Sequence, residues 1–386
     1  MPQVGVCFKR IEAYGLSLYD SYASSSRWSS RKGTGLSRQH LNSIFDTLLD
    51  NEMLTSIADA ECEALPVSPT DLSLYNVLRY HLGFLDSTFA PVRSDAGKRI
   101  RPRLVMLIAE ALNADPSAAI HTAAAIELLH NFTLIHDDIQ DVSLLRRHRP
   151  TVWSLWGVAQ AINAGDAMFA VAHLALNRSV TSGVPPTTTL RLSNALHQTT
   201  LRIVEGQALD LGFEERPDVS AEEYLGMIAG KTAAITRLAC WAGAIIAGSP
   251  EAEADAIGEF GHALGIGFQV QDDWLGVWGK PDQTGKVAAD DIRRRKKSLP
   301  ILLLHARAEP GDRKRLDVIF GQSEVQPDQV AEILDLMTQY EIDHEVRAEV
   351  RAWHDGSARA LESALPSGSA QDELAALVAS LGTRTG

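Results

Sequence analysis

The sequence has few cysteines and few long apolar runs, and each shortage excludes a class of protein. Its three cysteines, Cys7, Cys62 and Cys240, are scattered, which fits a reducing compartment better than a disulfide framework. A membrane-spanning helix needs roughly 18 consecutive apolar residues. The longest apolar run, around Leu238 to Ala247, predicts only a buried helix. We therefore expect a soluble, cytoplasmic protein without a transmembrane segment.

Basic residues are also scarce relative to acidic ones. The chain has 36 Lys and Arg against 49 Asp and Glu, which gives a formal net charge of −13. Nucleic-acid binding depends on Lys and Arg that neutralise phosphates, so this balance argues against a nucleic-acid partner. Any anionic ligand would have to be held by local basic clusters within an acidic protein.

The chain divides into a short leader and a long helical part. Residues 23–33 are rich in serine, basic and free of acids. We expect residues 1–65 to form a flexible N-terminal extension with no catalytic role; a cleaved targeting peptide is the alternative. From about Leu72 onward, apolar residues recur at helical spacing, and Pro and Gly breakers separate the runs. We predict an all-α fold for residues 66–386, a single large helical bundle around a central cavity.

Two aspartate-rich stretches, residues 136–141 and 269–273, interrupt the apolar helical pattern. Asp137 and Asp141 lie four residues apart, so on one helix face their oxygens can share a hard metal ion. Mg²⁺ prefers a few carboxylates with water and substrate phosphate oxygens to an all-protein cage. The pattern therefore predicts a magnesium site that binds a diphosphate. A solvated helix end is the alternative, but it fits poorly with three acids in five residues after an apolar run.

Basic groups occur at residues 97–103, 230–232 and 286–297. Each run alone is typical of a solvated face. Because they alternate with the two acidic clusters, together they indicate two anion sites around one magnesium-rich centre. The helix before the second cluster contains Gly258, Gly261, Gly265 and Gly267, each of which costs about 1 kcal/mol relative to alanine. Such a helix predicts the close approach of another backbone or of a ligand.

Six motifs follow one another in a fixed order along the chain: Gly97-Lys98-Arg99-Ile100-Arg101-Pro102, the DDxxD of Asp137 to Asp141 with Arg146-Arg147 behind it, Gly165-Asp166, Glu205-Gly206-Gln207, Gly230-Lys231-Thr232 and Phe268 to Asp273. This ordered set resembles that of trans-isoprenyl diphosphate synthases, in a pattern closest to geranylgeranyl diphosphate synthases. The resemblance covers about residues 72–365.

The resemblance implies an enzyme that condenses isopentenyl diphosphate with an allylic diphosphate, works with three Mg²⁺ ions and forms a homodimer. Asp137, Asp141, Lys231 and Asp272 would be its catalytic residues, and the three aspartates would bind the metal. Isopentenyl diphosphate would be held by Lys98, Arg101, His130 and Arg147. The allylic diphosphate would be held by Arg146, Lys231, Thr232, Gln269, Lys286 and Lys296.

One position departs from the family pattern. Gly276 stands where the last aspartate of the second motif is often found. In the family the first aspartate of that motif, here Asp272, is the main metal ligand. We therefore expect activity to survive, with a weaker site for the third ion.

Product length is expected to depend on the residues one turn before Asp137. Helical geometry at about 100° per residue places Thr133 beneath Asp137 and favours Thr133 as the lining residue. The family resemblance instead favours Phe132, an aromatic residue five positions before the motif, as part of the floor, and implies a twenty-carbon product. Both residues are retained as candidates.

Three alternatives remain. A class I terpene cyclase-like enzyme also ionises prenyl diphosphates with aspartate-bound Mg²⁺, but it needs no second substrate site such as Lys98 and Arg101 would form. A di-iron helical bundle is suggested by Glu127-x-x-His130 and Glu259-x-x-His262, which leave the aspartate and lysine clusters unexplained. A non-catalytic partner subunit typically loses the first acidic motif, which this chain keeps.

Overall fold

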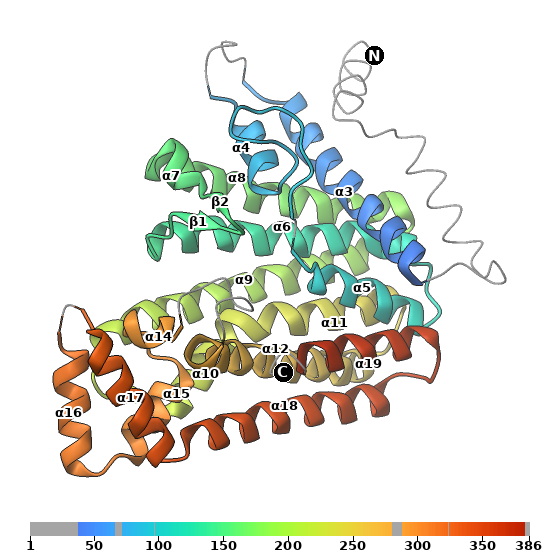
Figure 1. The fold of residues 1–386 in the computed structure, drawn as a ribbon. Helices are drawn as coiled ribbons and strands as arrows, with labels where there is room; N and C mark the ends of the chain where they lie inside the picture. Colours follow the sequence, from blue (N-terminus) through green and yellow to red (C-terminus); the bar gives the residue numbers. More distant parts are fainter. Residues whose placement is uncertain (1–37, 66–71, 96, 280–287, 323, 383–386) are drawn as a thin grey trace. The chain divides into compact units, whose positions relative to one another are not determined.

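The computed structural model describes residues 38–65, 72–95, 97–279, 288–322 and 324–382 (Figure 1). These residues are almost entirely helical, and their strands are the short antiparallel pair β1 (Leu145–Arg146) and β2 (Arg149–Pro150). The predicted all-α class is confirmed. The helices are α3 (Arg38–Cys62), α4 (Leu74–His81), α5 (Ile100–Ala111), α6 (Pro116–Gln140), α7 (Val152–Trp156), α8 (Val158–Asn177), η1 (Arg178–Ser182), α9 (Pro186–Glu215), α10 (Ala221–Ile228), η2 (Ala229–Ala233), α11 (Ala234–Ile246), α12 (Glu251–Trp278), α14 (Asp290–Arg293), α15 (Leu299–Arg307), α16 (Pro310–Phe320), α17 (Pro327–Gln339), α18 (Ile342–Ala364) and α19 (Ser369–Gly382).

The breakers in the sequence coincide with helix ends. Asp115 caps α6 by accepting a hydrogen bond from the Ser117 amide, and Pro116 occupies the first helical position, where its missing N–H costs nothing. Pro310 and Pro327 likewise occupy the first helical positions of α16 and α17. Gly248, with a φ of 83°, lies in the turn after α11. The sequence therefore fixes these helix boundaries through ordinary capping chemistry.

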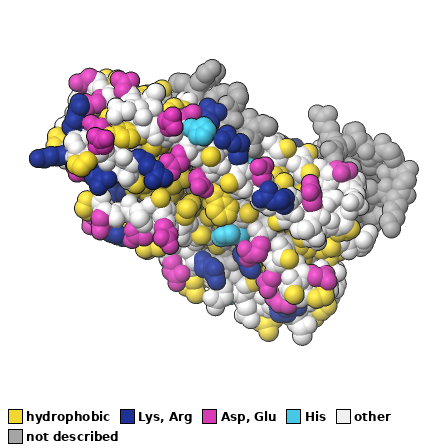
Figure 2. Space-filling view, turned by 90° about the horizontal axis from the view of Figure 1, so that it is seen from below, with side chains coloured by type: hydrophobic (Ala, Val, Ile, Leu, Met, Phe, Trp, Pro, Cys, Tyr) yellow, Lys and Arg dark blue, Asp and Glu magenta, His cyan; other side chains and the backbone are white. Residues whose placement is uncertain are grey.

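The chain folds as two compact units, and α9 and α11 contribute residues to both. The first unit contains Met1–Leu196 and Ala242–Pro250; the second contains His197–Trp241 and Glu251–Gly386. The sequence predicted one bundle and gave no sign of this division, because helical periodicity runs without a break through α9 and α11. On the face shown in Figure 2, acidic side chains lie among the Lys and Arg residues.

In the first unit, α6 packs against α3, α5 and α8. Its inward residues include Ala123, Ala124 and Leu128, which are fully buried. Helix α3 joins this core through Leu49, Met53 and Ile57, none more than 1% exposed. The prediction of a flexible extension over residues 1–65 is therefore wrong for residues 38–62. The serine-rich run at 23–33 lies outside the described residues.

In the second unit, α12 packs against α18, which runs alongside it (Figure 1). A Cβ atom at Gly261 would lie 2.5 Å from the carbonyl oxygen of Thr236, and one at Gly265 would lie 2.6 Å from Cα of Ala233. Both neighbours belong to the segment formed by η2 and α11. The close backbone approach predicted from the glycines of α12 is thus confirmed.

One expectation about membrane segments needs correction. Cys240, in α11, is free and buried. Residues Ser117–Gln140 are long and apolar enough to pass a membrane-span test, although 67% of the tested window is buried inside the protein. Such burial is typical of the core helix of a globular protein, and the predicted cytoplasmic location stays a prediction.

Candidate active site

The first aspartate motif ends α6, and its three carboxylates have different surroundings. Asp138 is 2% exposed and accepts two hydrogen bonds from Nε of Arg146, at 2.9 and 3.0 Å. Burial raises the pKa of Asp138 despite this partner. Asp137 is only partly buried and Asp141 is exposed, with the amide of Asp141 bonded to the carbonyl of Asp137 at 2.8 Å. The middle aspartate therefore anchors Arg146, and the outer two carry the metal-binding prediction.

A two-stranded hairpin follows the motif and turns at Arg147 and His148. Both residues have positive φ, 50° and 61°, as a type I′ turn requires. Gly97, with φ of 77°, lies against the Arg147 side chain, because a Cβ atom there would be 2.6 Å from Nη2 of Arg147. This glycine allows the basic loop at residues 97–103 to lie beside the hairpin. The structure thus brings together two segments that the resemblance assigned to isopentenyl diphosphate.

The same region has an excess of positive charge. Burial and the guanidinium groups of Arg101, Arg147 and Arg146 hold the pKa of His130 well below its usual range. Burial lowers the pKa of Arg147 and raises that of Glu127, a buried carboxyl that accepts a hydrogen bond from Asn131. A group of cations that lower the pKa of a nearby histidine is an environment suited to an anion.

A small pocket lies in this region of the first unit. Burial, together with three arginines, lowers the pKa of His81 in the pocket to about 3. Sequence reasoning missed His81, which lies at the end of α4 without a motif around it. The pocket is lined by Tyr80, His81, Asp95, Asn131, Leu134, Asp138, Arg146, Arg147, Arg149, Pro150 and Thr151.

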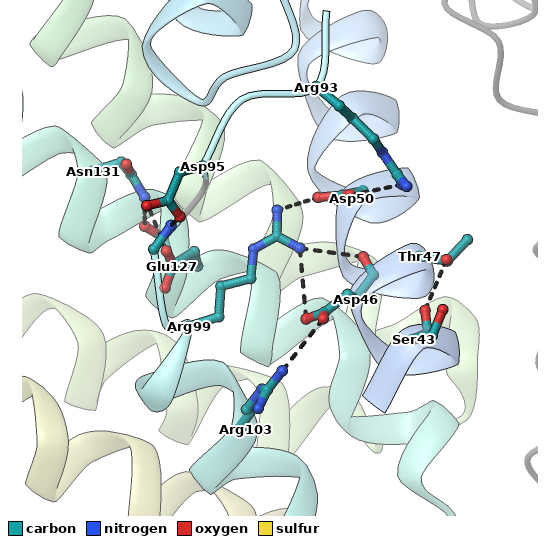
Figure 3. Close-up of polar contacts among 11 residues, drawn as sticks. Ser43, Asp46, Thr47, Asp50, Arg93, Asp95, Arg99, Arg103, Glu127 and Asn131 are labelled. Carbon is teal, nitrogen blue, oxygen red and sulfur yellow. Dashed lines mark hydrogen bonds and ion pairs between the residues drawn. The ribbon is translucent and has the colours of Figure 1, made fainter. Parts of the chain in front are cut away.

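Arg99, in the middle of the basic loop, is turned away from this region towards α3 (Figure 3). It is 8% exposed and pairs with Asp50, and it also donates to the carbonyl oxygen of Asp46 at 3.3 Å. Arg103 lies 3.3 Å from the Asp46 carboxylate. Two arginines of this basic segment, Arg99 and Arg103, therefore pair with carboxylates of α3. Lys98 is exposed, and the anion-binding roles of Lys98 and Arg101 stay predictions.

The two chain-length candidates have different partners. The Phe132 ring lies 5.2 Å from the ring of Phe169 in α8 and 5.0 Å from that of His136. The Thr133 hydroxyl donates to the carbonyl oxygen of His130 at 2.8 Å, within its own helix. Gly165, part of a motif noted in the sequence, leaves room for the imidazole of His136, which a Cβ atom there would meet. Phe132 is thus the candidate with an aromatic neighbour on another helix.

In the second unit, Lys231 and Thr232 lie in η2, a single π-helical turn between α10 and α11. Gly230-Lys231-Thr232 thus interrupts the regular α-helical pattern, and π-helical turns are frequent at functional sites. Lys231 forms an ion pair with Asp210 of α9. Gly206, also in α9, lies directly against the backbone of Lys231. Thr232 donates to Oε1 of Gln269 at 3.1 Å. Thr232 and Gln269, predicted to act together, are in contact.

The second aspartate pair of α12 also divides into an inner and an outer residue. Asp273 is 1% exposed and accepts hydrogen bonds from the Tyr224 hydroxyl, from Nε2 of Gln269 at 3.0 Å and from the Leu299 amide at 3.2 Å. Burial raises the pKa of Asp273. Asp272 is only partly buried, and its role as a metal ligand stays a prediction. Tyr224, which no motif identified, fixes the inner aspartate.

The remaining predicted residues are distributed as follows. Asp137 and Asp141 belong to the first unit, and Asp272 belongs to the second. Lys296 is exposed, just after α14, and Lys286 lies outside the described residues. Within the described part of the chain, no three His, Cys, Asp or Glu side chains gather where they could hold an ion by themselves. Glu259 of the di-iron pattern is 62% exposed and paired with Arg237.

Comparison with known proteins identifies the family. The polyprenyl synthetase family model matches residues 84–337, about two thirds of the chain. The chain belongs to the polyprenyl synthetase family. The polyprenyl synthetase of Streptomyces coelicolor A3(2), a crystal structure, is 33% identical with a TM-score of 0.77, and the match covers 87% of this chain and 97% of that one. The predicted family and helical architecture are confirmed, and this family does not favour the cyclase alternative.

Relatives within the family carry two different names. A (2E,6E)-farnesyl diphosphate synthase of Mycobacterium bovis is 46% identical over 58% of this chain and 61% of its own length. A geranylgeranyl diphosphate synthase of Mycobacterium tuberculosis is 42% identical over 60% of this chain and 65% of its own. The chain thus matches less than two thirds of either relative, and the two names differ in product.

Proposed function

We propose that this protein is a trans-prenyltransferase that condenses isopentenyl diphosphate with an allylic diphosphate to give an all-trans short-chain prenyl diphosphate. The observation that carries the proposal is the cationic region of Arg101, Arg146 and Arg147 beside a DDxxD helix end, in a member of the polyprenyl synthetase family. A basic pocket suits one diphosphate, and a partly exposed aspartate pair suits a second diphosphate held through metal.

Mg²⁺ fits the residues present. Asp137 and Asp141 offer carboxylates one helical turn apart, and Asp272 offers a third, while Asp138 and Asp273 are buried and hydrogen-bonded to Arg146 and Tyr224. One or two carboxylates completed by phosphate and water oxygens make up the set that Mg²⁺ prefers. When bound, three Mg²⁺ ions would stabilise the charge that develops on the leaving diphosphate.

The chain's own groups would orient the two substrates. Lys98, Arg101 and Arg147 would hold isopentenyl diphosphate, and the lowered pKa of His130 keeps that side chain neutral near pH 7, able to donate one hydrogen bond. Arg146, Lys231, Thr232 and Gln269, with Lys286 and Lys296, would hold the allylic diphosphate. Fixed cations placed where negative charge develops are an effective form of transition-state stabilisation.

For the product we propose geranylgeranyl diphosphate. The contact between the tilted rings of Phe132 in α6 and Phe169 in α8 supports this, because it places aromatic bulk about one turn before Asp137. The relatives are named geranylgeranyl and farnesyl diphosphate synthases, and both names denote short-chain prenyl diphosphate products.

We also propose that the protein is a homodimer. Helix α8 exposes Val158, Ile162 and Leu174, which are 44% to 47% exposed, and α9 exposes Leu190, Leu201, Val204 and Leu209. Exposed apolar surface larger than isolated side chains often marks a protein-protein contact. Sedimentation equilibrium at micromolar concentration should give twice the monomer mass of 41.9 kDa.

The function is tested by incubating the protein with isopentenyl diphosphate and, separately, the five-, ten- and fifteen-carbon allylic diphosphates, with and without Mg²⁺. We expect Mg²⁺-dependent formation of a twenty-carbon diphosphate. Incubation with geranylgeranyl diphosphate alone provides the control, since a hydrocarbon product there would identify a cyclase. Absence of any elongated diphosphate with all three partners would overturn the proposal.

A further inference from the structure

The second aspartate motif lacks its last acid, and another residue occupies the space that this acid would take. Gly276 lies four residues after Asp272, on the same face of α12. A Cβ atom at Gly276 would lie 2.5 Å from Cγ and 2.8 Å from Oδ1 of Asp291. A side chain at 276 and the present position of Asp291 exclude each other.

We propose that Asp291 supplies, from α14, the carboxylate that Gly276 removes from the second metal motif. The proposal rests on the proposed prenyltransferase function. On a helix, the Cβ positions of residues i and i+4 are about 5–6 Å apart. A carboxylate lying over the Cβ position of Gly276 is therefore near enough to Asp272 to bind the same ion or its water shell.

The local fold holds the Asp291 carboxylate in place. Asp291 is 4% exposed, and its neighbour Ile292 is fully buried in the core of the second unit. The Asp291 carbonyl accepts a hydrogen bond from the Lys296 amide at 2.9 Å, which closes the short α14 turn. The side chain is thus positioned by packing rather than by a flexible tether.

A buried carboxylate needs compensation. Buried charges are paired with other charges or coordinate metals. Among the described residues, the ion pairs around α14 join Asp290 to Arg294, and no ion pair involves Asp291. Asp273, the other buried acid nearby, accepts three hydrogen bonds. Asp291 is therefore about as buried as Asp273 but makes no ion pair within the described part of the chain, as a metal-directed group would.

The experiment measures metal binding directly. Mn²⁺ binding in the presence of inorganic pyrophosphate is followed by isothermal titration and by electron paramagnetic resonance, for wild type, Asp291→Asn and Asp290→Asn. Asp290→Asn is the matched control, since Asp290 pairs with Arg294 near the surface. Loss of an outer metal partner typically costs about 10- to 100-fold in affinity. We expect at least a tenfold weaker apparent Kd for one Mn²⁺ in Asp291→Asn and no change in Asp290→Asn.

A second variant tests the exchange of positions. In Gly276→Asp/Asp291→Gly, the acid returns to α12 and the space above it is cleared. This double variant should recover Mn²⁺ affinity to within about threefold of wild type, whereas Gly276→Asp alone should fold poorly because the two carboxylates overlap. Wild-type affinity in Asp291→Asn, or no recovery in a folded double variant, would overturn the inference.

Failure of the inference can be told apart from failure of the proposed function. If wild type binds Mn²⁺ with pyrophosphate and elongates allylic diphosphates while Asp291→Asn binds equally well, only the role of Asp291 is wrong. If wild type neither binds Mn²⁺ with pyrophosphate nor forms an elongated product, the prenyltransferase proposal itself is wrong, and Asp291 has no metal to serve.

Discussion

Arg99 and Asp50 form a buried ion pair that joins the basic loop to helix α3. Their side chains are 6% and 8% exposed. Arg93 approaches the same carboxylate at 3.4 Å, and burial raises the pKa of Asp50 against these cations. Since Lys98 and Arg101 flank Arg99, the pair fixes the loop that carries two predicted substrate groups. A helix placed by sequence reasoning in a flexible extension thus positions part of the candidate site.

Replacing Asp50 by Asn should weaken both folding and substrate binding. Removing one member of a buried ion pair typically costs about 3–5 kcal/mol because it leaves the other charge uncompensated. We expect a loss of this order in the free energy of unfolding, together with a raised KM for isopentenyl diphosphate. The control is Asp59→Asn, whose pair with Arg178 is half exposed and should be worth about 1 kcal/mol or less. An unchanged KM would show that α3 does not position the loop.

His81 should make stability fall in mild acid. Its pKa is about 3 in the folded protein, lowered by burial and then by Arg146, Arg147 and Arg149, against 6.5 for an ordinary histidine. Between these values the unfolded chain binds a proton that the folded protein does not. The stabilisation is therefore complete above pH 6.5 and declines as the pH is lowered through this window. Urea unfolding of His81→Asn should show a shallower decline between pH 6.5 and 4.5; identical slopes would contradict the assignment.

His148 should be replaceable by glycine at a gain in stability. It is exposed and has a φ of 61° at the second turn position of the hairpin. The left-handed conformation costs a side-chain-bearing residue roughly 1–2 kcal/mol, and the extra entropy of glycine offsets about 0.5–1 kcal/mol of that. We expect His148→Gly to raise the free energy of unfolding by up to about 1 kcal/mol. Leu145→Gly, in the adjoining strand, should lower it, and a lower melting temperature for His148→Gly would oppose this interpretation.

Phe132 should limit product length, with Phe169 behind it. Phe132→Ala removes one ring of the contact with Phe169 and should shift the main product from twenty to twenty-five carbons. Phe132→Ala/Phe169→Ala should lengthen it further. Thr133→Ala is the matched comparison, because helical geometry alone favoured that residue. Product chromatography decides: lengthening in Thr133→Ala and none in Phe132→Ala would reverse the assignment.

Much of the architecture could be predicted because it depends on local chemistry. Asp115 and Pro116 mark the start of α6, and the glycines of α12 announce its close contact with η2 and α11. The aspartate motifs could be found because paired acids after an apolar helix have no simple packing explanation. Each of these patterns involves residues close together in the sequence, so it can be recognised within a single segment.

The structural roles of individual residues could not be predicted because they depend on partners distant in the sequence. The sequence alone does not distinguish Asp137 from Asp138 as a metal ligand. In the structure, Asp138 is the buried aspartate that is hydrogen-bonded to Arg146. Likewise, Asp273 is the buried aspartate that accepts a hydrogen bond from Tyr224, which is 49 residues away in the sequence. Asp291 lies over Gly276 only because α14 packs against α12. Helix α3 was misread because its buried apolar residues give a weak helical stripe among many polar ones.

The central claim is that the aspartates of each motif, Asp137 with Asp141 and Asp272, hold Mg²⁺ ions that bind a diphosphate. It is tested most directly by crystals grown with Mn²⁺, an unreactive thiolo analogue of an allylic diphosphate and isopentenyl diphosphate, with the ions located by anomalous diffraction. The account predicts ions on both aspartate motifs, each bonded to diphosphate oxygens, with isopentenyl diphosphate on Arg101 and Arg147. A diphosphate bound without ions at one of the motifs would contradict it.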